Sequence, residues 1–210
     1  MPAYLRRAHP LPHADLFGDA EASPEGLRYQ PGIVTPEEEA DLARRLDDLP
    51  FAPFDFHGHL ANRQIVGFGL RYDYARRAVV EAEPLPAWLT PLRDRVGAFA
   101  GQPAAAFVQV LINRYDPGAG IGWHRDKPQF GEVVGVSLLA PCIFRFRRKA
   151  GAGWDRESRT VEARSAYLLA GPARWQWEHS IPPLPERRYS ITLRTLAAAP
   201  QHRAAGVRPA

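Results

Sequence analysis

The chain has 210 residues, of which 45% are hydrophobic and 24% charged, as is usual for one globular domain. No run of about 18 to 20 apolar residues is present, which argues against a helical membrane protein. The single cysteine, Cys142, excludes an intrachain disulfide and a cysteine zinc cluster. We therefore expect a protein of a reducing, cytoplasmic setting.

The net charge of +4 mildly favours an anionic partner. Basic residues gather between Arg145 and Arg164, whereas acidic residues outnumber basic ones between Asp15 and Asp48. Two interpretations of the basic stretch stay open. It forms a surface that follows the phosphates of a nucleic acid, or its arginines only solvate one face of a sheet.

The first half of the chain predicts an arm, two helices and short strands. Residues 1–26 have no periodicity, and we expect a flexible N-terminal arm. Thr35 is a predicted N-cap, with Pro36 at the first helical position and Glu38 completing a capping box. Short strands fit residues 51–80, and a second helix follows residue 86 and ends at Gly101.

The second half predicts a β-rich core. Short runs of β-branched and aromatic residues, separated by Gly and Pro, predict strands at 107–114, 133–139, 143–148, 160–163, 167–170, 175–179 and 189–196. So many short strands favour a sandwich or jelly-roll barrel. We expect an α+β, mainly β fold in one domain, 27–198. In it, 27–105 form the helices and a hairpin lid, 106–198 form the core, and 199–210 form a C-terminal tail.

A histidine and an aspartate two residues apart follow the first of these core strands. On an extended segment His124 and Asp126 share a face, so both side chains can reach one metal ion. His179 lies at the end of the predicted strand 175–179. Two histidines and one carboxylate, with other positions open, are the ligand set of non-haem Fe(II) oxygenases. We expect these three residues to bind a metal.

Polar side chains alternate along the predicted last strand. Arg188, Ser190, Thr192 and Arg194 share one face, and apolar residues share the other. Two arginines inside a barrel are unfavourable without an anion, and a guanidinium binds a carboxylate through two parallel N–H groups. The pattern predicts a site for a small dicarboxylate near the metal. A solvent-facing edge strand gives the same pattern.

Five segments occur in a fixed order along this half: NRYDPG at 113–118, HRD at 124–126, SLL at 137–139, His179, and RYSITLR at 188–194. This order resembles the AlkB-like Fe(II)/2-oxoglutarate dioxygenases over about residues 107–196, with weaker similarity at 64–74. The resemblance implies a double-stranded β-helix that holds its metal at one mouth. It also implies Fe(II), 2-oxoglutarate and O₂ as cofactors.

The resemblance assigns roles residue by residue. The two histidines and the aspartate become the Fe(II) ligands, and no further catalytic residue is expected. Arg188 pairs with the far carboxylate of 2-oxoglutarate, and Asn113 and Tyr115 hydrogen-bond to the same molecule. Arg194 lies near the metal-side carboxylate. Ser190 belongs to the same 2-oxoglutarate site, where many family members have asparagine.

The substrate would lie under the hairpin lid. A flipped base needs aromatic faces and hydrogen bonds at its edge. We expect Tyr72, Tyr74, Trp123 and Lys127 to contact it, and the arginines of the lid, Arg63 among them, to meet phosphates. Many base-repairing members carry an acid just after the HxD motif. Lys127 stands there in this chain, which leaves RNA, a nucleoside or a protein side chain open as substrate.

These inferences favour an oxidoreductase that removes alkyl groups, such as methyl groups, from DNA or RNA bases in repair or demethylation. The products would be succinate, CO₂ and an aldehyde. We expect a monomer that binds alkylated nucleic acid and no membrane. One alternative is the same chemistry on a protein side chain or a small molecule. The other is a non-catalytic β-barrel that binds nucleic acid.

Overall fold

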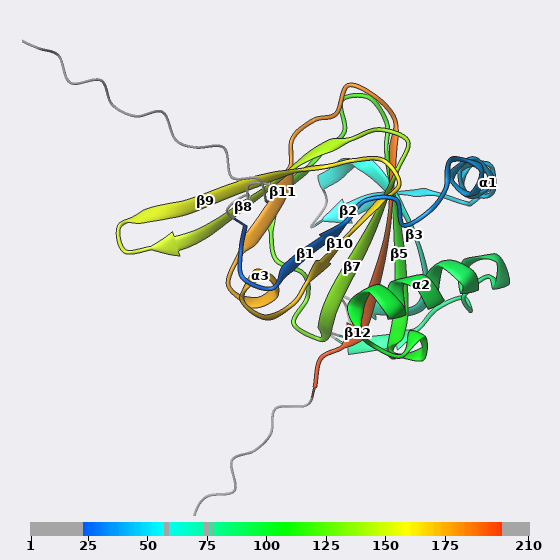
Figure 1. The fold of residues 1–210 in the computed structure, drawn as a ribbon, viewed down its shortest axis with the longest axis horizontal. Helices are drawn as coiled ribbons and strands as arrows, with labels where there is room; N and C mark the ends of the chain where they lie inside the picture. The colour runs from blue at the N-terminus through cyan, green and yellow to red at the C-terminus, as the bar shows by residue number, and fades with distance from the viewer. Residues whose placement is uncertain (1–22, 57–58, 74–75, 77, 199–210) are drawn as a thin grey trace, which may run out of the picture.

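The computed structural model describes residues 23–198 except 57, 58, 74, 75 and 77. Two antiparallel sheets face each other at its centre (Figure 1). The large sheet has the order β1-β10-β7-β12-β5-β3-β2, with β4 paired to β3. Its strands are β1 (Leu27–Gln30), β2 (Ala52–Phe56), β3 (His59–Asp73), β4 (Ala78–Glu81), β5 (Phe107–Tyr115), β7 (Phe130–Leu138), β10 (Ser165–Leu169) and β12 (Arg188–Leu196).

The small sheet has the order β6-β11-β8-β9. Its strands are β6 (Ile121–His124), β8 (Cys142–Ala150), β9 (Gly153–Val161) and β11 (Glu178–Ile181). Two facing antiparallel sheets, mostly β and flanked by two N-terminal helices, confirm the predicted jelly-roll class. None of the helices among the described residues has the length and apolar character needed to cross a bilayer.

Helix α1 (Pro36–Asp47) begins as predicted. The Thr35 hydroxyl accepts a hydrogen bond from the Glu38 backbone N–H, and the Glu38 carboxylate accepts one from the Thr35 N–H at 2.8 Å. Helix α2 (Thr90–Ala100) follows a 3-10 turn, η1 (Ala87–Leu89), and ends at Gly101 in a left-handed conformation (φ 74°). A second 3-10 turn, η2 (Ala104–Ala106), leads into β5.

The two helices cover the outer face of the large sheet (Figure 1). A cluster of fully buried apolar side chains joins them to its central strands, and its members include Leu46, Val96, Ile112, Val136 and Ile191. A second cluster lies between the two sheets and contains Phe144, Phe146 and Tyr167. The Tyr167 ring crosses the chain at Gly135, where a Cβ atom would lie 2.2 Å from it. The polar site described below lies beside this second cluster.

Three expectations need correction. Residues 175–177 are not a strand, because Pro172 starts a short helix, α3 (Gly171–Trp175), and β11 begins only at Glu178. Trp175 is therefore exposed, whereas Trp177 is buried. Strand β9 covers Gly153–Val161 instead of the predicted 160–163. The prediction missed most of this strand because its polar residues carry no strong strand signal.

The third correction concerns the boundary of the N-terminal arm. Residues 1–22 lie outside the described part of the chain. Residues 24–26, which we assigned to the arm, are bound to the domain. The Ala170 N–H donates to the Gly26 carbonyl, and the Ala173 N–H donates to the Glu25 carbonyl.

Candidate active site

His124 and His179 come from neighbouring strands of the small sheet. They are direct partners in the antiparallel register of β6 and β11, and a bulge lies between this pair and the pair Ile121 and Ile181. His124 faces the large sheet together with His179, whose register partner on β8 is the buried Phe146. The two imidazole rings meet edge to face, with centroids 4.3 Å apart, and the Phe144 ring packs against His179 at 5.2 Å.

Asp126 completes this group two residues after β6. Its Oδ2 lies 3.7 Å from Nε2 of His179. Its Oδ1 accepts two hydrogen bonds from Arg194, one from Nε at 3.1 Å and one from Nη2 at 2.7 Å. The remaining amino group of Arg194 donates to Oε1 of Gln109 at 3.1 Å. The carboxylate is therefore oriented from the large sheet and directed toward the two histidines.

The surroundings set the protonation state of all three side chains. Burial opposes ionisation of Asp126, but the nearby Arg194 guanidinium and the two histidines hold its pKa well below its usual range. Burial, together with the neighbouring His124, lowers the pKa of His179 to about 3. Burial also lowers the pKa of His124. An anionic carboxylate beside two neutral imidazoles is the state in which these groups bind a metal.

The three side chains lie together without a finished coordination shell. Among the residues that the structure describes, no three His, Cys, Asp or Glu side chains already surround a common point at metal-binding spacing. The Nδ1 atom of His124 lies 2.9 Å from the Gly122 carbonyl. A backbone contact of this kind fixes the tautomer and leaves the other ring nitrogen for a metal. The donor set therefore suits Fe(II) chemically.

Arg188 lies nearby with its side chain completely buried. Its Nε donates to the Ser137 hydroxyl at 2.9 Å. Within the described part of the chain its two terminal nitrogens, Nη1 and Nη2, have no hydrogen-bond partner. A buried guanidinium whose two terminal nitrogens have no hydrogen-bond partner is strongly unfavourable. A carboxylate that accepts two parallel hydrogen bonds would remove this cost, so the residues present fit one end of a small dicarboxylic acid.

The other predicted 2-oxoglutarate residues gather around this guanidinium. Arg188 is the register partner of Tyr115, and Ser190 is the partner of Asn113. The Arg188 guanidinium lies 5.3 Å from the centre of the Tyr115 ring. Burial raises the pKa of the Tyr115 phenol, although Arg188 opposes the shift, so Tyr115 is a neutral hydrogen-bond donor. Strands β5 and β12 thus bring alternate polar residues together in one site.

Two buried arginines belong to this region although sequence reasoning did not place them there. Arg63 was expected to meet phosphates, but it is only 7% exposed, and its Nε donates to Asn113 at 3.3 Å. Arg174 donates to the carbonyls of Lys127, Phe130 and Gly131 at 2.7 to 2.8 Å. It thereby fixes the loop that follows Asp126. Neither role has a signal in the sequence, because each depends on contacts between distant segments.

Two of the four expected substrate contacts meet above the site. The Lys127 ammonium lies 5.1 Å from the centre of the Tyr72 ring. Since Lys127 follows Asp126 directly, the contact brings the end of β3 next to the predicted metal site. Tyr74 lies outside the described residues.

The structure places Trp123 away from the predicted metal site. Its ring packs against Arg145 and Arg147, at 5.1 and 4.6 Å from the guanidinium carbons. These arginines alternate with the buried Phe144 and Phe146 of β8, so they point away from the large sheet. Trp123 therefore lies on the opposite face of the small sheet from the two histidines, as alternation along β6 requires of a residue next to His124.

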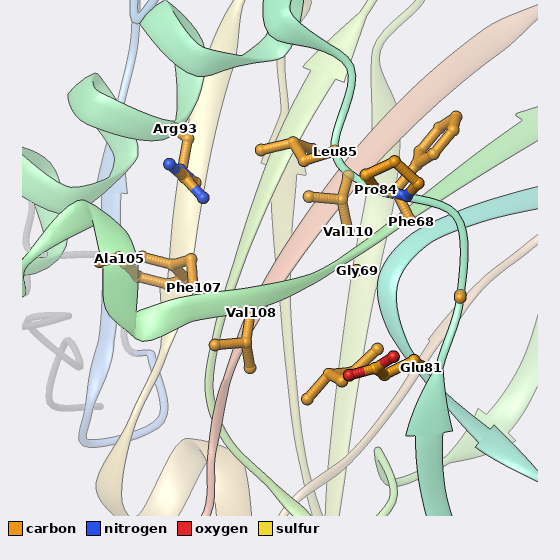
Figure 2. Close-up of a pocket in the computed structure, with 12 residues that line it drawn as sticks. Phe68, Gly69, Glu81, Pro84, Leu85, Arg93, Ala105, Phe107, Val108 and Val110 are labelled. Atoms are coloured by element: carbon orange, nitrogen blue, oxygen red, sulfur yellow. The ribbon is translucent and has the colours of Figure 1, made fainter.

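A cavity of about 530 Å³ is separate from the polar site (Figure 2). Phe68, Leu85, Arg93 and Val110 are among the residues that line it. Phe68 and Val110 belong to the apolar cluster on the helix side of the large sheet. The cavity thus lies behind the sheet that carries Arg188, and none of the predicted site residues lines it.

Comparison with known proteins agrees with this architecture. The profile of the 2OG-Fe(II) oxygenase superfamily matches residues 26–203. The solved structure of OsALKBH1 superposes with a TM-score of 0.62 at 17% identity, over 83% of this chain and 98% of that one. The superposition supports the jelly-roll fold.

Three curated relatives are similar in sequence. The Alkylated DNA repair protein ALKBH8 homolog of Arabidopsis thaliana is 28% identical over 78% of this chain and 53% of its own length. The tRNA (carboxymethyluridine(34)-5-O)-methyltransferase ALKBH8 of Mus musculus is 27% identical over 78% of this chain and 25% of its own. The Probable RNA/DNA demethylase ALKBH6 of Danio rerio is 31% identical over 70% and 60%. The chain thus spans about half of the first relative and a quarter of the second.

Proposed function

The chain belongs to the 2OG-Fe(II) oxygenase superfamily, and we propose that it removes methyl or other alkyl groups oxidatively from nucleic acid bases. It is an AlkB-like, 2-oxoglutarate-dependent dioxygenase, and the family uses Fe(II), 2-oxoglutarate and O₂. The observation that carries the proposal is the fully buried guanidinium of Arg188 beside the cluster of His124, Asp126 and His179. Its two terminal nitrogens have no hydrogen-bond partner among the described residues, so they are free to bind an anion.

We assign the metal to the two imidazoles and the Asp126 carboxylate. Their surroundings favour the metal-binding protonation states, because burial keeps the imidazoles neutral and Arg194 keeps the carboxylate ionised. Arg194 also holds the carboxylate by two hydrogen bonds to one oxygen. When bound, Fe(II) with 2-oxoglutarate and O₂ supplies the oxidation of a substrate C–H bond and yields succinate and CO₂.

The polar site on β5 and β12 is assigned to 2-oxoglutarate. The two terminal nitrogens of Arg188 would bind the far carboxylate of 2-oxoglutarate. Ser137 accepts the hydrogen bond from Nε of Arg188, which leaves both terminal nitrogens for the ligand. Asn113, Tyr115 and Ser190 supply further hydrogen-bonding groups around it. A cosubstrate fixed in this way lies with its reactive end toward the metal, and little rotational freedom remains to be lost in the reaction.

The substrate proposal rests on the relatives and on the side chains above the site. Two of the relatives are named for DNA repair or for RNA/DNA demethylation, and a third for a tRNA modification. Tyr72 offers an aromatic face to a base, and Lys127 offers a charge to its edge or to a phosphate. Hydroxylation of an N-methyl carbon gives an unstable product that releases formaldehyde and the repaired base.

The experiment offers the enzyme, with Fe(II), ascorbate and 2-oxoglutarate, a panel of N-methylated DNA, RNA and peptides. We expect formaldehyde and succinate in equal amounts from at least one nucleic acid. Formaldehyde from peptides alone would favour the same chemistry on a protein side chain. The chain is an oxygenase by family, so the non-catalytic barrel is the weaker alternative.

We further propose a cytoplasmic monomer. The single thiol, Cys142, is free and buried, which suits a reducing compartment. Size-exclusion chromatography with light scattering tests the monomer, for which we expect a mass near 23.4 kDa.

A further inference from the structure

The β8–β9 hairpin sorts its charges between two faces. Arg147 of β8 is the direct register partner of Arg156 of β9, and both lie on the face that points away from the large sheet. Arg145 and Lys149 share that face, since they alternate with the buried phenylalanines of β8. The acids of β9, Asp155 and Glu157, occupy the other face. We call Arg145, Arg147, Lys149 and Arg156, with Trp123 and Trp154, the basic hairpin face.

Two like charges directly opposite each other destabilise an antiparallel pair. The pair of Arg147 and Arg156 is of this kind. The acid placed to compensate is Glu178 of β11, which lies 2.7 Å from Nε of Arg147. One carboxylate beside four cations leaves an excess of positive charge. A surface that served only to solvate the sheet would gain stability from an acid at position 156, so the pattern points to an anionic partner.

Aromatic rings separate these cations. Trp123 lies between Arg145 and Arg147, and Trp154 packs against Arg147 at 4.3 Å and Lys149 at 5.2 Å. Trp154 is nevertheless 37% exposed. Exposed aromatic rings among cations are the chemistry with which proteins hold single-stranded nucleic acid, because bases stack on the rings while phosphates meet the charges.

The basic hairpin face is distinct from the active site. On β11 the side chain of His179 points toward the large sheet, whereas its neighbour Ser180 accepts a hydrogen bond from Arg145 on the outer face. In Figure 1 the β8–β9 hairpin projects beyond the other labelled helices and strands. A nucleic acid strand bound there would lie on the opposite face of the small sheet from His124 and His179.

We propose that the basic hairpin face binds a single-stranded segment of the nucleic acid substrate away from the reacting base. The choice of partner rests on the proposed function, but the binding itself needs neither metal nor 2-oxoglutarate. An acidic protein is disfavoured, because carboxylates would satisfy the arginines and leave the exposed Trp154 ring without a stacking partner.

The test measures binding of a fluorescein-labelled, unmodified single-stranded RNA of about 15 nucleotides by anisotropy. The variant Lys149→Gln/Arg156→Gln removes two exposed cations from the basic hairpin face. The matched control, Arg44→Gln/Arg45→Gln, removes two cations from the exposed face of α1. Binding to single strands weakens with salt by a slope of about 0.7 per phosphate contact. We therefore expect the hairpin variant to lower this slope by about 1.4 and to raise Kd on the order of tenfold.

A separate variant tests the contribution of the Trp154 ring to RNA binding. Trp154→Ala should raise Kd about fivefold or more while leaving the salt slope unchanged, because base stacking carries no net charge. An unchanged Kd and slope in the hairpin double variant, or an equal loss in the α1 control, would overturn the proposal. Displacement of the RNA by a polyglutamate peptide of equal charge at equal concentration would also overturn it, in favour of an acidic protein.

Failure of this inference differs from failure of the proposed function. His124→Ala should bind the RNA as the wild type does, since it leaves the outer face intact. If the wild type releases no formaldehyde but binds RNA through Lys149 and Arg156, the proposed function fails and the hairpin site stands. If methylated RNA is demethylated equally well by the wild type and the hairpin variant, with equal Kd, the hairpin site fails alone.

Discussion

Both hydrogen bonds that Arg194 donates to Asp126 end on the same oxygen. Nε and Nη2 contact Oδ1 at 3.1 and 2.7 Å, which leaves Oδ2 facing His179 at 3.7 Å. The arginine thus sets both the charge and the direction of the carboxylate. Gln109 holds the arginine in turn, so a chain of contacts runs from β5 through β12 to the proposed metal ligand.

Arg194→Gln should weaken metal binding. Residues that orient a metal ligand typically contribute tenfold to hundredfold in affinity, and we expect a loss of about that size. Titration with Fe(II) under argon, or with Co(II) as a probe, measures it. Arg194→Lys should recover part of the affinity because the charge remains, and unchanged metal affinity in Arg194→Gln would contradict the role assigned to the pair.

Arg188→Gln should raise the KM for 2-oxoglutarate by about a hundredfold, because removal of one partner of a buried charge pair costs about 2 to 5 kcal/mol. Steady-state succinate formation at varied 2-oxoglutarate gives this value. Circular dichroism shows whether the variant folds.

Ser137→Ala is the matched test for orientation of the same guanidinium. It removes the acceptor of Nε but leaves the charge. A hydrogen bond to a charged group contributes about 1.5 to 3 kcal/mol, so the KM should rise by about tenfold. If the serine variant affects KM more than the arginine variant, the terminal nitrogens of Arg188 do not bind the cosubstrate.

The predicted site residues on β12 were accessible from sequence because alternation along a strand is local. The spacing of Arg188, Ser190 and Arg194 placed them on one face, and all three are buried on one face of the structure. The spacing of His124 and Asp126 likewise indicated that they lie together. Their meeting with His179 depends on strand order, which no local pattern gives, so it was expected only from the ligand set of non-haem Fe(II) oxygenases and from the family resemblance.

Where the structure differs from the sequence prediction, each difference has a specific cause. Trp123 lies on the outer face because neighbouring residues of a strand point to opposite faces, so its place next to His124 in the sequence does not bring it to the metal site. Pro172 begins a helix where the tryptophans after it suggested a strand. Arg63 is buried only because β3 pairs with β5. These contacts join distant segments, so local patterns do not show them.

Tyr72 and Lys127 should determine the KM for nucleic acid. Tyr72→Ala removes the ring beneath the Lys127 ammonium, and we expect a KM for methylated oligonucleotide that is about fivefold or more higher. Tyr72→Phe keeps the ring and should behave like the wild type. The KM for 2-oxoglutarate should stay constant in both, and a change in that value instead would place the tyrosine in the cosubstrate site.

The contribution of Glu38, in the first turn of helix α1, to the free energy of unfolding should depend on pH. A hydrogen bond from Arg95, with another from the Thr35 backbone, lowers the pKa of Glu38 to about 2 from a usual 4.5. A depressed pKa means that the ionised carboxylate stabilises the folded state above about pH 4.5, and that this contribution is lost as the pH falls toward 2. Glu38→Gln should therefore be less stable than the wild type at about pH 6.

Urea unfolding at about pH 6 and pH 3.5 checks this contribution. The difference between wild type and Glu38→Gln should shrink at the lower pH. An equal or larger difference there would show that Glu38 contributes through something other than its charge.

The most direct measurement of the central claim is succinate formation from 2-oxoglutarate under air, with and without Fe(II), in the wild type and in folded His124→Ala and His179→Ala variants. We predict succinate from the wild type only when Fe(II) is present, and none above background from either variant. Wild-type protein that makes no succinate with any methylated substrate, or a histidine variant that keeps wild-type turnover, would contradict the account.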